Sequence, residues 1–191
     1  VVSTQSTGIG SMGADICQAD VFQQGDYTIK ICLLGDKGVG KSSLQYYYLR
    51  NTVLTENIEI PAEDIKVLTP NPGTTINIEF KDSQGQEQSH PATDPFWNEF
   101  IFGCQCVLCC FDLSDKDSLE KVKPWVDSVL RYGGTVILIG CKSDCDRKIE
   151  KETAKMYADD KQIDYYETSA HKGTDIDPMF KHICRKMLRV Q

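Results

Sequence analysis

The chain has 191 residues, a formal net charge of −7 and a hydrophobic content of 40%. This length suffices for one α/β domain with a sizeable core and is short for two. The acidic balance, without a dense Lys/Arg run, argues against a nucleic-acid-binding surface. No stretch approaches the roughly 18 uninterrupted apolar residues of a membrane-spanning helix. A secretory signal is not indicated, so we expect a cytoplasmic protein.

The first 26 residues are poor in apolar side chains and rich in Ser, Thr, Gly and Gln. We expect residues 1–26 to form a flexible N-terminal extension. Gly10-Ser11-Met12 resembles the remnant of an expression tag, so residues 1–12 support no functional argument. The folded domain is expected to span residues 27–191.

From Tyr27 onward, apolar runs typical of buried strands alternate with longer stretches typical of helices. Such alternation predicts an α/β fold with a mostly parallel sheet covered by helices on both faces. The predicted strands are 27–34, 57–68 (the least regular), 74–82, 106–112, 135–140 and 163–167, and the predicted helices are 41–51, 94–102, 116–131, 148–160 and 174–189.

A phosphate-binding loop joins the first predicted strand to the first predicted helix. Residues 35–42 read Gly-Asp-Lys-Gly-Val-Gly-Lys-Ser and match the pattern GxxxxGK[ST]. The glycines let backbone N–H groups converge on phosphate oxygens, and the helix N-terminus adds partial positive charge. Lys41 is placed to reach the β- and γ-phosphates, and the Ser42 hydroxyl to bind Mg²⁺. The predicted phosphate-binding residues in this loop are Gly35, Lys37, Gly38, Val39, Gly40, Lys41, Ser42 and Ser43.

A second motif follows strand 74–82, which runs into Asp82-Ser-Gln-Gly-Gln. An aspartate that ends a strand beside a phosphate loop is placed to hold the Mg²⁺ shell through water. Gly85 allows its N–H to approach a terminal phosphate, and Gln86 is a candidate to orient attacking water. We therefore predict Asp82 as a metal-binding residue, Gly85 as phosphate-binding and Gln86 as catalytic.

Two later strands end in residues that suit a guanine base. Strand 135–140 is followed by Cys-Lys-Ser-Asp, in which the Lys142 stem is expected to lie along a purine ring. The Asp144 carboxylate can accept from two donors on the guanine edge, and adenine offers no matching pair. After strand 163–167 come Thr168, Ser169 and Ala170, small residues whose backbone N–H groups are expected to meet the guanine carbonyl, and Ser169 and Ala170 are the predicted base-binding residues.

In this order and spacing the motifs resemble the Ras superfamily of small GTPases, most closely the Rab family. The resemblance covers roughly residues 27–190 and rests on Gly35–Ser42, Asp82-x-x-Gly85-Gln86, Val122-Lys-x-Trp125, Lys142-x-Asp144 and Glu167-Thr-Ser-Ala170. It implies a P-loop NTPase fold with a six-stranded sheet, and Mg²⁺-dependent binding of GDP or GTP. It also implies slow GTP hydrolysis and two switch loops that reorder with the γ-phosphate. Effector, exchange-factor and activating proteins would contact these loops, in vesicle traffic or signalling.

Several positions depart from the family pattern. Ile60 stands where the family has a threonine that binds Mg²⁺ and senses the γ-phosphate, unless a re-registered loop uses Thr55 or Thr69. Cys141 replaces an asparagine that contacts guanine and ties its loop to the phosphate loop, a loss of about 1–2 kcal/mol. The aromatic residue usually stacked on the base falls near Val53 or Leu54.

These departures leave alternatives open. Lys37 has a small residue as its family counterpart, and we expect it to point to solvent rather than to the γ-phosphate. The alternative function is that of a nucleotide-binding interaction module that neither cycles nor hydrolyses GTP appreciably. A P-loop ATPase or kinase is a more remote reading, against which Asp144 argues.

The cysteines and the chain end complete the expectations. The chain has nine cysteines, and the run Cys106–Phe111 reads as an apolar strand in which thiols pack as small hydrophobic groups. We therefore favour reduced core cysteines over a disulfide framework or a zinc or iron–sulfur site. Because no terminal cysteine motif for prenylation is present, membrane contact is expected only through an anchor outside this sequence, peripherally on endomembranes.

Overall fold

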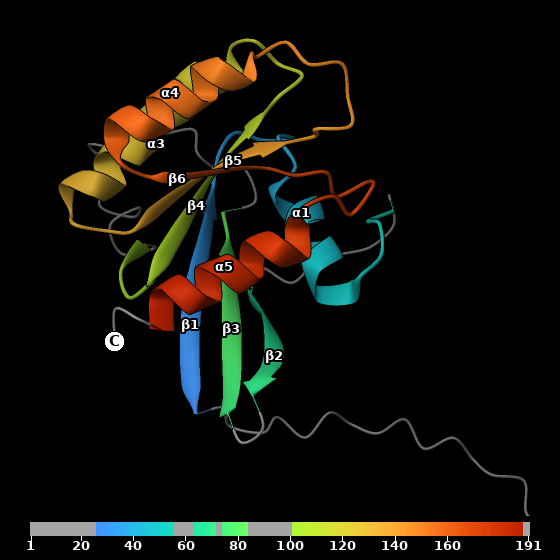
Figure 1. Cartoon of the computed structure of the whole chain (residues 1–191), viewed down its shortest axis with the longest axis vertical. Coiled ribbons are helices and arrows are strands. Elements are labelled where there is room, and N and C mark those ends of the chain that lie inside the picture. Colours follow the sequence, from blue (N-terminus) through green and yellow to red (C-terminus); the bar gives the residue numbers. More distant parts are fainter. Residues whose placement is uncertain (1–25, 56–62, 72–73, 84–100, 189–191) are drawn as a thin grey trace, which may run out of the picture.

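The computed structural model of the chain describes residues 26–55, 63–71, 74–83 and 101–188 (Figure 1). Within these ranges the chain forms six strands and four helices. The strands are β1 Tyr27–Leu34, β2 Glu63–Asn71, β3 Thr74–Asp82, β4 Cys106–Asp112, β5 Val136–Cys141 and β6 Asp164–Glu167, and the helices are α1 Lys41–Arg50, α3 Ser118–Arg131, α4 Lys151–Lys161 and α5 Ile176–Leu188. No helix in the described ranges has the length and hydropathy needed to cross a bilayer.

The strands form one sheet in the order β2-β3-β1-β4-β5-β6. Only β2 is antiparallel to its neighbour β3, and the pairs β3–β1, β1–β4, β4–β5 and β5–β6 are parallel. The predicted six-stranded, mostly parallel sheet is therefore confirmed. Because parallel strands end at the same edge, the loops that follow β1, β4, β5 and β6 gather on one side of the molecule.

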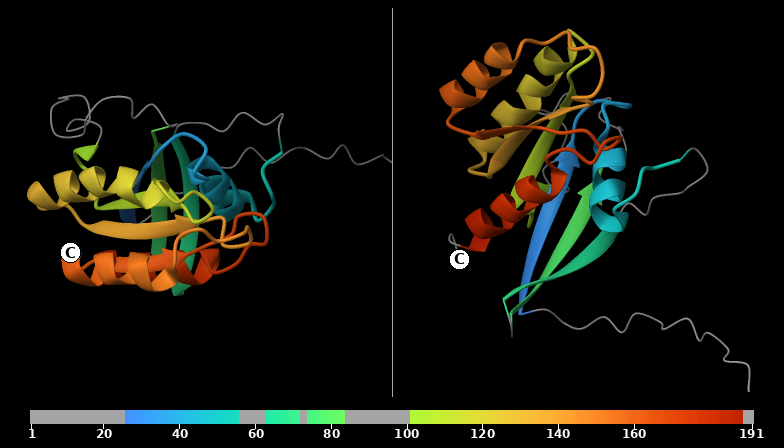
Figure 2. Two further views of the ribbon diagram at one scale, coloured as in Figure 1. Left: turned by 90° about the horizontal axis from the view of Figure 1, so that it is seen from above. Right: turned by 45° about the vertical axis from the view of Figure 1, so that its right-hand side comes forward.

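Helices cover both faces of the sheet, as the view from above in Figure 2 shows. One face packs against α1 and α5 through Leu44, Tyr48, Phe180 and their neighbours, and the other packs against α3 and α4. The side chains of β4 alternate between the two layers, as the pleat of a strand requires. Its thiols follow this alternation, with Cys106 and Cys110 in the first layer and Cys109 in the second. The cysteines of β4 therefore pack as apolar core residues.

The elements agree closely with the predictions, apart from their ends. Strand β2 is described over 63–71 and continues past the predicted end at residue 68 because it pairs with β3, whereas residues 57–62 of the predicted strand lie outside the described residues. Helix α4 begins at Lys151 instead of residue 148, because the backbone N–H groups of Lys148 and Ile149 donate to the Leu113 carbonyl, at 2.8 and 3.3 Å. The predicted helix 94–102 falls mostly outside the described residues, as does the N-terminal extension.

Candidate functional site

The loop between β1 and α1 has the backbone geometry of a phosphate cradle. Gly35 has a φ of 141°, and a Cβ atom at this position would lie 2.2 Å from the Cys110 carbonyl oxygen, so only glycine fits. Gly40 precedes α1 with a φ of 115°. Lys41 is 4% exposed, and its ammonium donates to the carbonyl oxygens of Gly35 and, at 3.0 Å, Asp36. A buried cation at a helix N-terminus suits a phosphate group.

The other predicted residues of this loop differ in exposure. Val39 is buried and belongs to the core, whereas Ser42 and Ser43 are half-buried in the first turn of α1. Lys37 and Gly38 are exposed. The side chain of Lys37 therefore lies on the surface, as expected.

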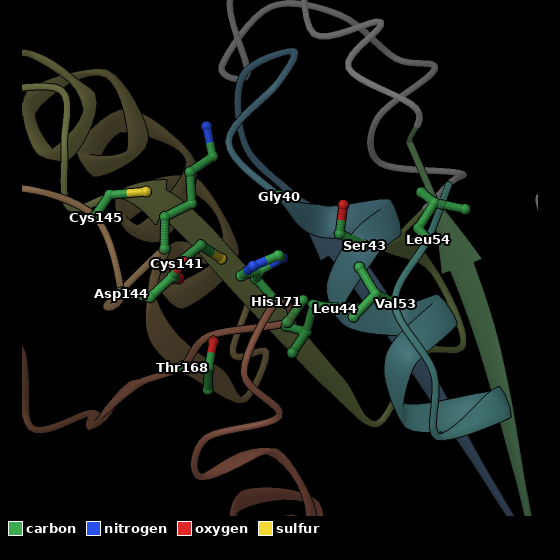
Figure 3. A pocket seen from close by; sticks show the side chains of 12 residues that line it. Gly40, Ser43, Leu44, Val53, Leu54, Cys141, Asp144, Cys145, Thr168 and His171 are labelled. Atoms are coloured by element: carbon green, nitrogen blue, oxygen red, sulfur yellow. The ribbon is translucent and has the colours of Figure 1, made fainter. Parts of the chain in front are cut away.

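A cavity of about 450 Å³ lies between the N-terminal part of α1 and the loops that follow β5 and β6 (Figure 3). The structure brings together five residues predicted from the sequence, which are Gly40 and Ser43 from the phosphate loop and Lys142, Asp144 and Ala170 from the base loops. Val53 and Leu54, predicted near the base, also line it. The size suits a nucleotide-sized ligand.

Asp144 is held in place from behind by Ser169. The Ser169 hydroxyl donates to Asp144 Oδ1 at 2.6 Å and accepts from the backbone N–H of Lys172 at 3.0 Å. This hydrogen bond from Ser169 is the main reason that the pKa of Asp144 lies below its ordinary value. Asp144 therefore stays ionised and fixed in orientation, ready to accept hydrogen bonds at the cavity wall.

Ser169 itself is fully buried and does not line the cavity. Its backbone N–H donates to the Thr174 carbonyl at 3.3 Å, so it already has a partner. Among the described residues the Ala170 N–H has no acceptor, and Ala170 does line the cavity. The Thr168 N–H also has a partner, the Gly140 carbonyl at 2.8 Å, so of the three amides predicted to meet a guanine carbonyl the Ala170 amide is the one that is available.

Lys142 is anchored to the sheet edge. Its backbone adopts a left-handed conformation with a φ of 61°, and its ammonium lies 2.6 Å from Asp112 Oδ2 at the end of β4. Asp112 also accepts from the Ser114 backbone N–H at 2.8 Å. Burial raises the pKa of Asp112, but the hydrogen bonds from Lys142 and Ser114 outweigh it, so the net shift is downward. The ion pair fixes the end of the Lys142 side chain, so its stem stays on the cavity wall.

Comparison with known proteins agrees with this geometry. The family model described as "Ras family" matches residues 30–189. This chain belongs to the Ras family of small GTPases. It is 33% identical over 168 residues to GTP-binding protein ypt1 of Schizosaccharomyces pombe, covering 85% of this chain and 81% of that protein. It is 33% identical over 161 residues to Ras-related protein RABD2a of Arabidopsis thaliana (81% and 77%), and 32% identical over 161 residues to GTP-binding protein YPTM2 of Zea mays, with the same coverage.

Membership of the Ras family implies that the cavity binds a guanine nucleotide. The chain is Rab-like by these similarities, which agrees with the resemblance found in the motifs. The buried Lys41, the Cβ-free cradle at Gly35 and the acceptor Asp144 fit such a ligand.

Cys141, which stands where the family has asparagine, contacts the phosphate loop directly. It is 3% exposed, and its Cβ lies 3.3 Å from the position that a Cβ on Gly40 would occupy. Its thiol also neighbours Cys110, whose pKa is raised by that contact and by burial. The base loop and phosphate loop of this GTPase are therefore joined by packing of a thiol, where the family uses an amide.

Three residues that line the cavity were missed by reasoning from the sequence, namely Leu44, Cys145 and His171. Figure 3 shows the imidazole of His171 between Cys141 and the side chains of Leu44 and Val53. His171 follows the predicted base residue Ala170 directly, and this adjacency was the signal available in the sequence. Leu44 and Cys145 carried no comparable signal.

The predicted magnesium and water positions are only partly described. Asp82 ends β3 beside Leu33 of β1, which brings its backbone to the edge of the sheet where the phosphate loop begins. Its side chain, and the whole of Ile60, Gly85 and Gln86, lie outside the described residues. In the ranges that are described, no group of three or more His, Cys, Asp and Glu side chains is arranged to hold a metal ion. Ser42 in α1 is the described residue that fits Mg²⁺ in a P-loop.

Proposed function

We propose that this chain is a Rab-like molecular switch that binds GDP and GTP together with Mg²⁺ and hydrolyses GTP slowly. One observation carries the proposal, namely that a single cavity joins the phosphate loop, with its buried Lys41, to the base-loop acceptor Asp144. A nucleotide placed there would have its phosphates at the N-terminus of α1 and its guanine ring beside Asp144 and Ala170.

The proposed roles of the residues follow from this placement. The Lys41 ammonium and the loop N–H groups would neutralise the phosphate oxygens. Mg²⁺ would supply further neutralising charge, held by the Ser42 hydroxyl and, through water, by the Asp82 carboxylate. Gln86 would orient the attacking water, and Gly85 would let a backbone N–H approach the terminal phosphate.

The cellular role is proposed from the similarities. The relatives named Ras-related or Rab-type proteins favour a switch in vesicle traffic or signalling. Effector, exchange-factor and activating proteins would recognise the two switch loops, the first containing Ile60 and the second Gln86. The protein would act in the cytoplasm, peripherally on endomembranes.

The first experiment is to denature the purified protein and identify the released nucleotide by chromatography. We expect GDP in near-stoichiometric amount from the wild type and little nucleotide from Lys41→Ala. An adenine nucleotide in its place, or a nucleotide content unaffected by Lys41→Ala, would refute the proposed binding mode.

A second candidate function, a nucleotide-binding module that does not cycle, is favoured by Cys141 and by Ile60. Cys141 joins the base loop and the phosphate loop without an amide, and Ile60 has no hydroxyl that could bind Mg²⁺. Single-turnover hydrolysis of GTP distinguishes the candidates. A measurable rate that Gln86→Leu abolishes supports the switch, whereas a negligible rate that Gln86→Leu leaves unchanged supports the module.

A further inference from the structure

A second cavity, of about 370 Å³, lies between α5, the C-terminal half of α1 and strands β2 and β3. Figure 1 shows α5 crossing in front of the sheet near these strands. The cavity shares no lining residue with the nucleotide cavity. Its volume falls in the range of small-molecule sites. It is therefore a separate candidate site, which nothing in the proposed function uses.

The inner wall of this cavity is mainly apolar. Leu68, Ile76, Cys184 and Leu188 supply aliphatic and thiol surface from three different elements. The ring of Tyr48 is stacked on Phe180 with 3.8 Å between ring centroids and meets Phe80 edge to face. This aromatic cluster backs the cavity with apolar surface on which an apolar group can pack.

One buried polar atom belongs to this wall. Tyr48 is 3% exposed, and its hydroxyl has no hydrogen-bond partner in the described part of the chain. Burial raises the pKa of Tyr48, and Cys184 and Asp177, which also line the cavity, raise it further. The hydroxyl is thus a neutral donor close to the cavity wall. An unsatisfied buried donor of this kind favours a ligand that brings an acceptor.

The charges around the cavity are mostly positive, although the chain as a whole is acidic. Lys66, Lys181 and Arg185 line it together with a single carboxylate, Asp177. The ammonium of Lys66 lies 3.8 Å from the centroid of the Tyr48 ring, and burial lowers its pKa while Asp177 opposes that shift. The Lys66 ammonium also donates to the Tyr48 carbonyl oxygen, so it is already engaged by the wall of the cavity.

The remaining two cations lie at the edge of the cavity and have no ion-pair partner among the described residues. Lys181 and Arg185 are one helical turn apart on α5 and are exposed. Two unpaired cations beside an apolar wall match a ligand with an anionic head and an apolar body.

We propose that this cavity binds a small amphiphilic anion, a free aliphatic carboxylate whose chain packs on Leu68, Ile76 and Leu188. Its head group pairs with Lys181 and Arg185, and an oxygen of the head group accepts from the Tyr48 hydroxyl after a small movement of the wall. Since α1 also carries the phosphate loop at its other end, the ligand would contact the same helix that holds the nucleotide.

Three probes with the same eight-carbon chain test the charge requirement, namely octanoate, 1-octanol and octylammonium. Each is titrated into ¹⁵N-labelled protein with its co-purified nucleotide, and amide chemical shifts are followed by NMR. We expect octanoate to shift amides of α5, β2 and β3 saturably and to bind at least tenfold more tightly than octanol. Octylammonium is expected to bind more weakly still.

Matched variants test the residues. K181E/R185E reverses both rim charges and should weaken octanoate at least tenfold, whereas K151E/K155E reverses two exposed lysines of α4 with the same spacing and should leave affinity unchanged. Tyr48→Phe keeps the ring, and its loss of the donor should weaken octanoate about fivefold. Absence of saturable shifts on α5 or equal affinity of octanoate and octanol would overturn the proposal. So would equal loss in the two double variants.

Discussion

At the scale of single residues, the nucleotide cavity depends on how its acceptor is held. Asp144 is only half-buried, so solvent would let a free carboxylate rotate. The hydroxyl of the fully buried Ser169 prevents this rotation by donating a hydrogen bond to Asp144 Oδ1. Lys142 is fixed in the same manner by Asp112. Residues that do not touch the ligand thus decide how precisely the ligand is recognised.

The pair Asp144–Ser169 gives the first prediction. Ser169→Ala removes the hydrogen bond that lowers the pKa of Asp144, so protonation of Asp144 should begin at a higher pH. A depressed pKa stabilises the charged form above it, and that benefit is lost as the pH falls through the pKa. GDP affinity, measured with a fluorescent GDP analogue, should therefore fall about three- to tenfold at pH 7 and more steeply toward pH 4. A loss that is the same at both pH values would mean that Ser169 acts only by packing.

Cys141 gives a second prediction at this scale. Cys141→Asn would restore an amide between the base loop and the phosphate loop, and one such hydrogen bond is worth about 1 kcal/mol. We expect GDP affinity to rise about fivefold, measured by competition against the same fluorescent analogue.

Cys145→Asn is the control for this change, because Cys145 lines the same cavity but is exposed. It should leave affinity unchanged. An affinity that falls in Cys141→Asn, at an unchanged melting temperature, would show that the thiol packing is itself the better arrangement.

At the scale of elements, the phosphate loop is fixed by where backbone passes close to backbone. Gly35→Ala places a methyl group against the Cys110 carbonyl of β4, which cannot move without disturbing the sheet. We expect it to lower the free energy of unfolding by about 3–5 kcal/mol, measured by urea denaturation of nucleotide-free protein.

Gly38→Ala is the matched control in the same loop. No atom of the described residues lies within 4 Å of its new methyl group, and its φ of 81° leaves backbone strain of about 1–2 kcal/mol. Similar losses in the two variants would contradict the role given to the contact between Gly35 and β4.

The elements also show what the sequence could predict. Strands β1, β3 and β4 have the predicted bounds because their apolar runs end abruptly at polar or glycine residues. The start of α4 was wrong because the Leu113 carbonyl, distant in sequence, captures two N–H groups that a helix would otherwise use. The predicted end of β2 was wrong for a similar reason, since pairing with β3 decides how far the strand continues.

In the candidate site, too, local sequence patterns predicted some features, and contacts between distant residues decided the others. Lys142, Asp144 and Ala170 were predicted because motif spacing identifies them. Tertiary contacts determine the hydrogen bond from Ser169 to Asp144, the ion pair between Lys142 and Asp112 and the place of His171. No local pattern in the sequence encodes such contacts, so they could not be predicted.

At the scale of the whole molecule, two cavities lie on the same face of the sheet, and helix α1 contributes to both. Helix α1 lines the nucleotide cavity with Leu44 and the second cavity with Tyr48, about one turn further along. Both residues also belong to the same core cluster. A ligand that binds the folded chain at either end of α1 would therefore raise the free energy of unfolding of the whole domain.

The last prediction concerns this coupling of nucleotide and fold. GDP with Mg²⁺ at about 100 times its Kd should add about 2.7 kcal/mol to the free energy of unfolding. For a domain of this size that corresponds to a rise in Tm of roughly 5–11 °C, measured by differential scanning calorimetry under reducing conditions. ATP at the same concentration should give little shift, because adenine presents no donor pair to Asp144. Asp144→Asn should melt near the unliganded wild type yet lose most of the GDP shift. Equal shifts with GDP and ATP would show that the phosphate loop alone binds the ligand and that the cavity does not select the base.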